Sequence, residues 1–148
     1  MVGELPGSIL FACTMNAVRS PMAEAIMKHL FGQRVYVDSA GARKGELDPF
    51  VVVVMDEIGI DLSRHRPKTF NDLEDHSFDV VVTLSPDAQH RAIELTRHMA
   101  CEVEYWRTQD PAAIEGSREV RLTAYREVRD ALWSRIVARF TPAAPPTV

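Results

Sequence analysis

Short apolar runs alternate with longer segments that carry apolar side chains at helical spacing along most of this chain. The short runs predict strands at 8–13, 34–39, 78–84 and 101–106. The longer segments predict helices at 21–31, 86–98 and 118–140, and each follows a serine suited to capping its first turn, namely Ser20, Ser85 and Ser117. In the last helix an apolar stripe is expected to face the core: Val120, Tyr125, Val128, Leu132, Ile136 and Phe140.

Four consecutive valines at 51–54 allow two interpretations. Local propensity favours a strand, because β-branched side chains suit an extended backbone. Asp48–Pro49, however, is a helix-start signal, and Gly59 is a suitable stop. We interpret the segment as a helix, in which one face would carry Phe50, Val53, Val54 and Ile58.

The strand–helix order, repeated four times, predicts the α/β class: a four-stranded parallel sheet with helices on both faces. We expect a single domain over 1–148, in which the proline-rich tail at 141–148 is disordered. Ligands in such folds bind beyond the carboxyl ends of the strands. Function is therefore expected at 13–19, 39–41, 85 and 107–111.

Composition and charge narrow the function classes. The net charge of −4 gives no reason to expect general nucleic-acid binding, which usually shows a basic patch. The first residues lack the basic region of an export signal, and their apolar run is too short to span a membrane. We therefore expect a cytoplasmic protein that keeps its two cysteines, Cys13 and Cys101, reduced. No CxxC or HExxH motif indicates a metal site, and no cofactor is expected.

The segment from Cys13 to Arg19 carries the clearest chemistry. It joins a predicted strand to a predicted helix, where successive backbone N–H groups and the helix dipole favour a bound anion. The same surroundings stabilise a cysteine thiolate, the nucleophilic form of the thiol. Arg19 can bind two phosphate oxygens through its planar guanidinium, and the Ser20 hydroxyl can donate to the sulfur. The pattern C-x5-R-S-P between the first strand and the first helix therefore indicates a phosphate-binding loop; a cysteine simply buried at a strand end is the alternative.

Cleavage of a phosphate ester also needs an acid that protonates the leaving oxygen. Asp110, which precedes Pro111 after the fourth predicted strand, lies at the correct edge of the sheet for this role. Asp-Pro is also common in turns, so the residues alone leave the role open. With Cys13 as nucleophile and Arg19 as phosphate ligand, the sequence indicates a cysteine-dependent phosphomonoesterase.

These motifs resemble those of the low-molecular-weight protein tyrosine phosphatases. That family has a first loop of the form C-x-G-N-x-C-R-S-P and an Asp-Pro acid loop before its last helix. This chain has C-T-M-N-A-V-R-S-P at 13–21 and Asp-Pro at 110–111. Further matches occur in the same order at 38–41, 48–49, 59–65 and 78–79, so the resemblance covers most of the chain. It implies the same α/β fold and a phosphatase that needs no cofactor.

The resemblance also implies a role for each matching residue. Cys13 would carry the phosphoryl group as phosphocysteine, Arg19 would bind phosphate, and Asp110 would act first as acid and then as base for water. The network that holds the loop would comprise Asn16, Ser20, Ser39 and His65. The substrate phosphate would meet the loop at Thr14, Met15, Asn16, Ala17, Val18 and Ser20. The partner would be a phosphorylated protein or a small phosphate ester, with inorganic phosphate as product, and neither nucleic acid nor a membrane.

Two departures from the family pattern lie in the loop itself. Met15 replaces the loop glycine, which would cost about 1–2 kcal/mol if that position needs a left-handed backbone. Val18 replaces the second loop cysteine, which removes a thiol that could protect Cys13 as a disulfide.

Two further departures concern the substrate. Ala112 and Ala113 follow the acid where the eukaryotic-type members have tyrosines. The loop at 39–48 is short and carries Arg43 and Lys44 but no aromatic side chain. A phosphotyrosine ring is therefore expected to find neither of its two aromatic walls.

Two alternative functions remain open. Arsenate reductases share this fold and loop, and they use further cysteines near the end of the third strand; here that stretch, 83–86, has none, and Cys101 precedes the fourth strand. The second alternative is a phosphate- or phosphoprotein-binding module in which Met15 has impaired catalysis. The presence of Cys13, Arg19 and Asp110 together argues against it.

Overall fold

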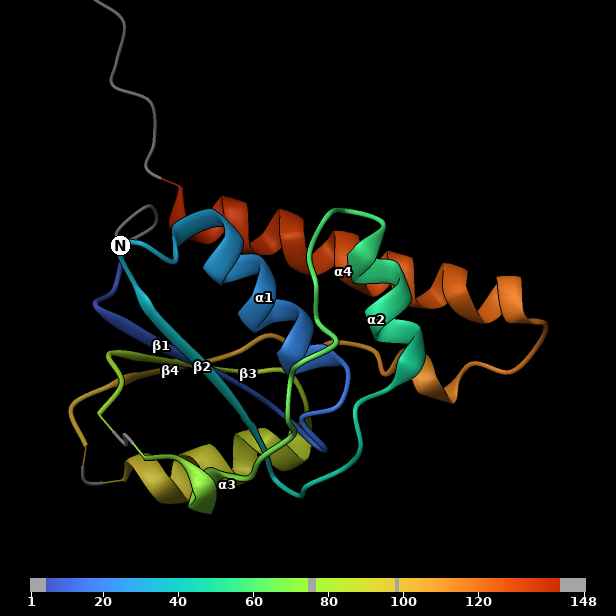
Figure 1. Ribbon diagram of the computed structural model, residues 1–148. Helices are drawn as coiled ribbons and strands as arrows, with labels where there is room; N and C mark the ends of the chain where they lie inside the picture. The colour runs from blue at the N-terminus through green and yellow to red at the C-terminus, as the bar shows by residue number, and fades with distance from the viewer. Residues whose placement is uncertain (1–4, 75–76, 98, 142–148) are drawn as a thin grey trace, which may run out of the picture.

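The first strand lies at the centre of a four-stranded parallel sheet in the order β2-β1-β3-β4, in a computed structural model that describes residues 5–74, 77–97 and 99–141 (Figure 1). The strands are β1 (Ser8–Cys13), β2 (Tyr36–Gly41), β3 (Val80–Thr83) and β4 (Glu102–Tyr105). Five of the six β1 residues are buried, as a strand paired on both sides and covered on both faces requires. The predicted α/β fold is confirmed.

Helices cover both faces of this sheet (Figure 1). They are α1 (Arg19–Phe31), α2 (Pro49–Asp56), α3 (Pro86–Thr96) and α4 (Arg118–Phe140), with short 3₁₀ turns η1 (Phe70–Asp72) and η2 (Pro111–Ala113). The helices α1 and α4 pack together over one face, and α2 packs on α4, whereas α3 covers the other face. Among the helices of the described residues, none is long and apolar enough to cross a membrane.

The ends of several elements differ from the prediction. Helix α1 begins at Arg19 rather than Pro21, and its N-cap is Val18, which makes no side-chain capping bond, so Ser20 is not the cap. The Ser20 hydroxyl faces the loop instead. Strand β2 continues through Gly41, where we expected a turn. Helix α3 ends at Thr96, and the predicted end at His98 lies outside the described residues, as does the tail from 142 onward.

The valine run is helical, as interpreted from its flanking signals. The Asp48 carboxylate caps α2 by accepting a hydrogen bond from the Phe50 N–H at 2.9 Å, and it also accepts one from the Tyr125 hydroxyl at 2.5 Å. These bonds fix α2 against α4. The predicted buried face is partly wrong, because Val51, Val54 and Met55 are buried while Val53 is 36% exposed.

The predicted stripe of α4 is right in its last four turns and wrong at its start. Tyr125, Val128, Leu132, Ile136 and Phe140 are buried, but Val120 is 52% exposed. The first turns of α4 extend beyond the sheet (Figure 1), so the side of the helix that carries Val120 has no strand to cover it. Leu122 is buried in its place.

Candidate active site

The loop between β1 and α1 turns its carbonyl groups away from the concave side. The carbonyls of Cys13, Thr14, Met15 and Ala17 accept hydrogen bonds from the backbone N–H groups of Ala42, Arg43, Gly45 and Asp48 at 2.8–3.3 Å. Within the described residues, the N–H groups of 15–18 donate no hydrogen bond. Four successive free donors beside a helix N-terminus form an anion-binding site.

Gly41 lets the end of β2 approach this loop. A Cβ atom there would lie 2.7 Å from the Asn16 nitrogen and 2.5 Å from the Arg43 carbonyl oxygen, both of which are backbone atoms that cannot move aside. The pairing of Cys13 with Gly41 in the sheet explains the requirement, because the 41–48 segment leaves β2 directly against the loop.

Asn16, rather than Met15, occupies the left-handed conformation in the loop. Its φ is 53°, and among the described residues it is the sole non-glycine with a positive φ. Asparagine tolerates this region better than most residues. The condition for strain at Met15 is therefore not met: Met15 has no left-handed backbone, and its side chain is 40% exposed at the edge of the site.

The buried Asn16 side chain uses all of its hydrogen-bonding capacity. Its amide nitrogen donates to the hydroxyls of Ser20 at 2.8 Å and Ser39 at 2.9 Å. Its carbonyl oxygen accepts from the Lys68 N–H at 3.0 Å and lies 3.1 Å from Nε2 of His65. The structure thus brings together the four residues predicted to support the loop.

A fifth member of this network, Glu24, was not predicted from the sequence. Its carboxylate accepts a hydrogen bond from the Ser39 hydroxyl, and it pairs with Lys28 one turn along α1, which in sequence resembles an ordinary surface ion pair. The carboxylate sets the direction of the chain of bonds. Because Ser39 donates to Glu24, it accepts from Asn16. Asn16 also donates to Ser20, so the Ser20 hydrogen can point at the Cys13 sulfur, 2.9 Å away, or at the Ala40 carbonyl oxygen, 3.5 Å away.

Cys13 lies at the end of this chain of bonds and is 2% exposed. Its Sγ is 2.9 Å from the Ser20 hydroxyl oxygen, and the Ser20 backbone N–H donates to the same sulfur at 3.4 Å. The cysteine sulfur therefore has two neighbouring groups that can donate to it. The two contacts are local consequences of the sequence, because Ser20 stands in the first turn of α1, immediately above the loop.

Arg19 connects the loop to the end of β4. Its guanidinium is largely buried and donates to the Thr108 carbonyl oxygen at 3.0 Å and to the Thr14 hydroxyl at 3.4 Å. Thr14 donates in turn to Ser85, the N-cap of α3, at 3.0 Å. The carboxyl ends of β1, β3 and β4 are thereby held in one arrangement.

Asp110 lies across a cleft of about 350 Å³ from Cys13 and Arg19. It is the N-cap of η2, where its carboxylate accepts from the Ala112 N–H at 3.0 Å, and the residue is exposed. The cleft therefore brings together the three residues predicted to be catalytic. Its lining comprises Cys13, Met15, Ala17, Val18, Arg19, Glu46, Leu47, Asp48, Pro49, Asp110 and Ala112.

The walls of the cleft carry carboxylates and no aromatic ring. Trp106 is buried against Phe11 and does not reach the cleft. Phe50 packs on Tyr125, with the guanidinium of Arg121 4.5 Å from its centre. Neither ring supplies the missing wall, whereas Glu46 and Asp48 add negative charge that the sequence alone did not place there.

His65 contacts the loop as a neutral ring. Burial lowers its pKa below the usual value, although the nearby Glu24 carboxylate, 3.8 Å from Nδ1, opposes the shift. Its Nε2 faces two oxygen atoms of Asn16, so Nε2 carries the hydrogen and donates it. The neutral ring is the form that fits this position.

The stability of the protein is expected to fall when His65 is protonated. Because its pKa is lower in the folded protein, the unfolded chain binds the proton first, and stability is lost as the pH falls below about 6.5. The measurement is urea unfolding between pH 7.5 and 5. His65→Gln, which keeps a donor, should flatten the profile there, and the same change at exposed His90 should not. Equal profiles for wild type and His65→Gln would show that His65 does not titrate in this way.

Fold and site together define an α/β protein with an anion-binding loop, a buried cysteine and an arginine beyond the central strand. A protein-family model described as low molecular weight phosphotyrosine protein phosphatase matches residues 8–138. The chain therefore belongs to this family, and the resemblance noted in the sequence is confirmed.

The individual relatives carry different functional names. An arsenate reductase of Shouchella clausii is 38% identical over 129 residues, which is 86% of this chain and 91% of that protein. A low molecular weight protein tyrosine phosphatase from T. tengcongensis matches in structure with a TM-score of 0.72 and 25% identity over 87% of this chain and 94% of that one. The YwlE arginine phosphatase, solved with a phosphorylated active site serine, matches with a TM-score of 0.69 and 25% identity over 86% and 89%. These names leave the reaction to be argued from this chain's own residues.

Proposed function

We propose that this protein hydrolyses phosphate monoesters through a phosphocysteine intermediate on Cys13. The observation that supports this most is the cleft in which Cys13, Arg19 and Asp110 meet beside the free N–H groups of 15–18. These groups supply the nucleophile, the donors for the phosphoryl oxygens and the acid that the reaction needs.

In the first step the Cys13 thiolate attacks phosphorus. The sulfur–phosphorus bond forms as the ester oxygen–phosphorus bond breaks, and the leaving oxygen takes a proton from the Asp110 carboxyl group. Arg19 and the N–H groups of the loop bind the equatorial oxygens, where charge is spread in the transition state. The Ser20 hydroxyl, 2.9 Å from sulfur, holds the thiolate in position before the attack.

In the second step water attacks the phosphocysteine. Asp110, now a carboxylate, takes a proton from the water as the new oxygen–phosphorus bond forms and the sulfur–phosphorus bond breaks. The Ser20 hydroxyl and backbone N–H stabilise the departing thiolate. Inorganic phosphate leaves, and the free enzyme is regenerated without any change of oxidation state.

Arsenate reduction is the second candidate, because the relatives of 33–38% identity carry that name. Reducing arsenate consumes two electrons, so two thiols must end as a disulfide. Ala12 is level with Thr83, and Thr83 with Tyr105, so Cys101 lies roughly 16 Å along the strands from the level of Cys13. A disulfide needs Cα atoms closer than about 7 Å. Burial also raises the pKa of the Cys101 thiol, which disfavours the reactive thiolate.

The third possibility, a binding module without catalysis, loses its main support. It rested on strain at Met15, and Met15 has no left-handed backbone. The cleft retains nucleophile, arginine and acid, an arrangement that binding alone does not require. We therefore favour an active enzyme.

The test is a panel of aryl, alkyl and sugar phosphates and phosphoarginine, assayed beside arsenate with a thiol reductant. We expect wild type to release phosphate, Cys13→Ser to release none, and Cys101→Ser to match wild type. Iodoacetate should inactivate wild type by alkylating Cys13, with phosphate protecting. Reduction of arsenate without any hydrolysis would replace the phosphatase by a reductase that uses an external thiol, and phosphate binding without product would leave a binding module.

We expect little selectivity for phosphotyrosine over other phosphate monoesters. Losing two aromatic walls should weaken selectivity by about 1–3 kcal/mol, or roughly 5- to 150-fold in kcat/KM. Arg43 does not compensate, because it pairs with Asp87 at 3.5 Å and does not line the cleft. The measurement compares kcat/KM for matched phosphotyrosine, phosphoserine and sugar-phosphate substrates. A preference for phosphotyrosine beyond about a thousandfold would mean that a wall forms on binding.

The acidic walls also favour a leaving group that carries positive charge. Glu46, Asp48 and Asp110 all line the cleft, and a guanidinium can pair with a carboxylate through two hydrogen bonds. Phosphoarginine combines such a group with a phosphoryl group, and the related YwlE structure is named an arginine phosphatase. For this reason phosphoarginine belongs in the panel, with Glu46→Gln as the variant that should selectively lower its hydrolysis.

A further inference from the structure

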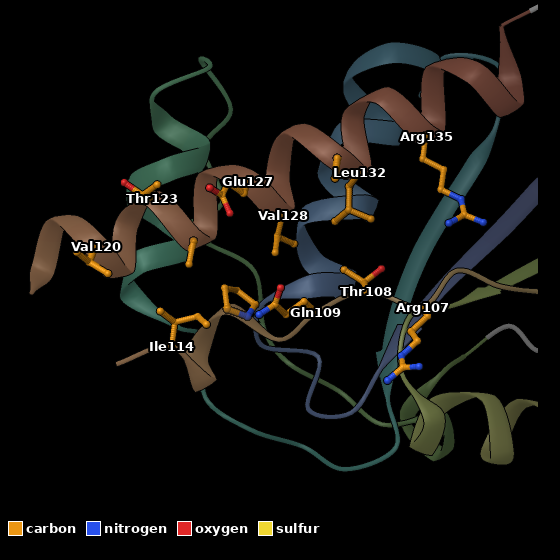
Figure 2. A pocket seen from close by; sticks show the side chains of 13 residues that line it. Arg107, Thr108, Gln109, Ile114, Val120, Thr123, Glu127, Val128, Leu132 and Arg135 are labelled. Carbon is orange, nitrogen blue, oxygen red and sulfur yellow. The ribbon is translucent and has the colours of Figure 1, made fainter. Parts of the chain in front are cut away.

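An open apolar groove runs along α4 beside the segment that carries Asp110. It has a volume of about 530 Å³ and lies between α4 and the segment 107–114 (Figure 2). We call it the α4 groove. Its walls include Ile114, Val120, Val128 and Leu132, with Val128 and Leu132 buried at its base and Val120 52% exposed at its edge. Exposed apolar surface in a concave site is a feature of protein-binding or ligand-binding surfaces.

The segment that carries the proposed catalytic acid lines both the α4 groove and the cleft. Asp110 and Ala112 line the cleft, while Gln109, Pro111 and Ile114 line the groove. Residues of this segment thus alternate between the two hollows. A molecule in the groove would lie next to a phosphorylated side chain in the cleft.

Two arginines give one end of the α4 groove a positive charge (Figure 2). Arg107 and Arg135 form no ion pair with any residue in the described part of the chain. Arg135 stacks on Trp106 at 4.9 Å, and the nearby Glu104 carboxylate is bonded to Arg139 instead. Glu127 lies nearer the Val120 end. The groove is therefore complementary to a ligand that is apolar along its length and acidic at the Arg107 end.

The length of the groove indicates a peptide rather than a small molecule. Positions 120 to 135 of α4 span about four turns, or roughly 22 Å, which matches six or seven residues of extended chain. One ligand can reach both hollows only if it continues from the cleft past residues 109–112.

We propose that the α4 groove binds the segment that flanks the phosphorylated residue in a phosphoprotein substrate. An apolar side chain of that segment packs between Ile114, Val120 and Leu132, and an acidic side chain pairs with Arg107. The proposal rests on the proposed function for the position of the phosphorylated residue. Burying one such apolar side chain is expected to improve kcat/KM roughly ten- to a hundredfold over a peptide without it.

The test uses a phosphopeptide with a leucine and an aspartate in its flank, the same peptide with both replaced by serine, and phenyl phosphate. Val120→Glu places a charge at the exposed edge of the groove and should lower kcat/KM for the first peptide about tenfold or more, mainly through KM. It should leave the serine peptide and phenyl phosphate unchanged. Ile93→Glu on α3, at an equally exposed position on the other face of the sheet, is the matched control.

A second pair of variants tests the charge. Arg107→Glu should weaken the aspartate peptide and spare a peptide with leucine but no aspartate, whereas Arg97→Glu at the end of α3 should spare both. Equal losses on peptide and phenyl phosphate, or no loss on the peptide, would overturn the groove proposal while leaving the phosphatase intact. Self-association of wild type that Val120→Glu abolishes, without an effect on the peptide, would assign the groove to a second copy of the chain.

Binding to Cys13→Ser, measured by fluorescence anisotropy, keeps the groove testable if wild type hydrolyses nothing. In that case the proposed function fails, but the groove can still be tested. Val120→Glu and Arg107→Glu, each combined with Cys13→Ser, should weaken binding of the leucine–aspartate peptide and leave binding of the serine peptide unchanged. Affinities that do not depend on these variants would overturn the groove proposal.

Discussion

Replacing Arg19 by lysine is expected to lower kcat/KM for phosphate esters roughly a hundred- to a thousandfold, the loss typical when one preorganised donor to the transition state is removed. The Arg19 guanidinium is largely buried and oriented by the Thr108 carbonyl and the Thr14 hydroxyl. Its planar fork can bind two phosphoryl oxygens, whereas a lysine ammonium is a single point charge. A positive charge alone should therefore not restore activity.

The measurements are kcat/KM with phenyl phosphate and the inhibition constant of inorganic phosphate, and both should worsen. Arg43→Lys is the control, because Arg43 is exposed and pairs with Asp87. A purely structural Arg19 would give a different result: lower thermal stability, but a kcat/KM within a few-fold of wild type once the protein is folded.

Replacing Asp110 by asparagine should lower kcat/KM about a hundred- to ten-thousandfold for phenyl phosphate. Because kcat/KM reports only the steps up to departure of the leaving group, the loss in kcat/KM should be small for 2,4-dinitrophenyl phosphate, whose leaving group departs without protonation. In wild type the Asp110 carboxylate accepts a hydrogen bond from the Ala112 N–H at 3.0 Å. The side-chain oxygen of asparagine can accept the same bond, so this variant loses the acid but keeps the turn at η2.

Asp110→Ala removes both the acid and the cap, and its comparison with Asp110→Asn separates the two contributions. Asp87→Asn, in the exposed first turn of α3, is the control. A loss in kcat/KM of equal size with both leaving groups would mean that Asp110 has a structural role and that another group is the acid.

Sequence patterns predicted the fold well where local signals agreed with tertiary packing. The helix-start signal at Asp48–Pro49 predicted the structure correctly, although four valines favour a strand. The reason is that the Asp48 carboxylate accepts hydrogen bonds from the Phe50 N–H and the Tyr125 hydroxyl, which stabilise the start of α2 and hold it against α4. Val120 shows the limit of periodicity. It falls on the apolar side of α4, but the helix extends past the sheet at that point, and no sequence pattern records where a sheet ends.

Much of the candidate site was also predictable, since the loop, the arginine and the acid follow strand ends. The orientation of the loop was not. The position that has a left-handed backbone is Asn16, one residue beyond Met15, and the short-range pattern did not show which of the two residues would adopt it. Glu24 was missed because its pairing with Lys28 gives it the pattern of a surface residue. The carboxylates that line the cleft come from the 46–48 segment, whose path depends on Gly41.

The position of the strands divides the candidate site into parts of unequal local stability. Cys13 is the last residue of β1, and Arg19 follows the loop after it; β1 is hydrogen-bonded on both sides and almost wholly buried. Asp110 follows β4, an edge strand of four residues that are all exposed or half-buried and that pairs with β3 alone. Edge elements of this kind open more often than a central strand, and their amide hydrogens exchange sooner. Transient opening of β4 would thus displace the acid and release the Thr108 carbonyl that orients Arg19, while the N–H groups of 15–18 keep their place after β1. As the protein approaches its melting temperature, turnover should therefore fall before phosphate binding is fully lost.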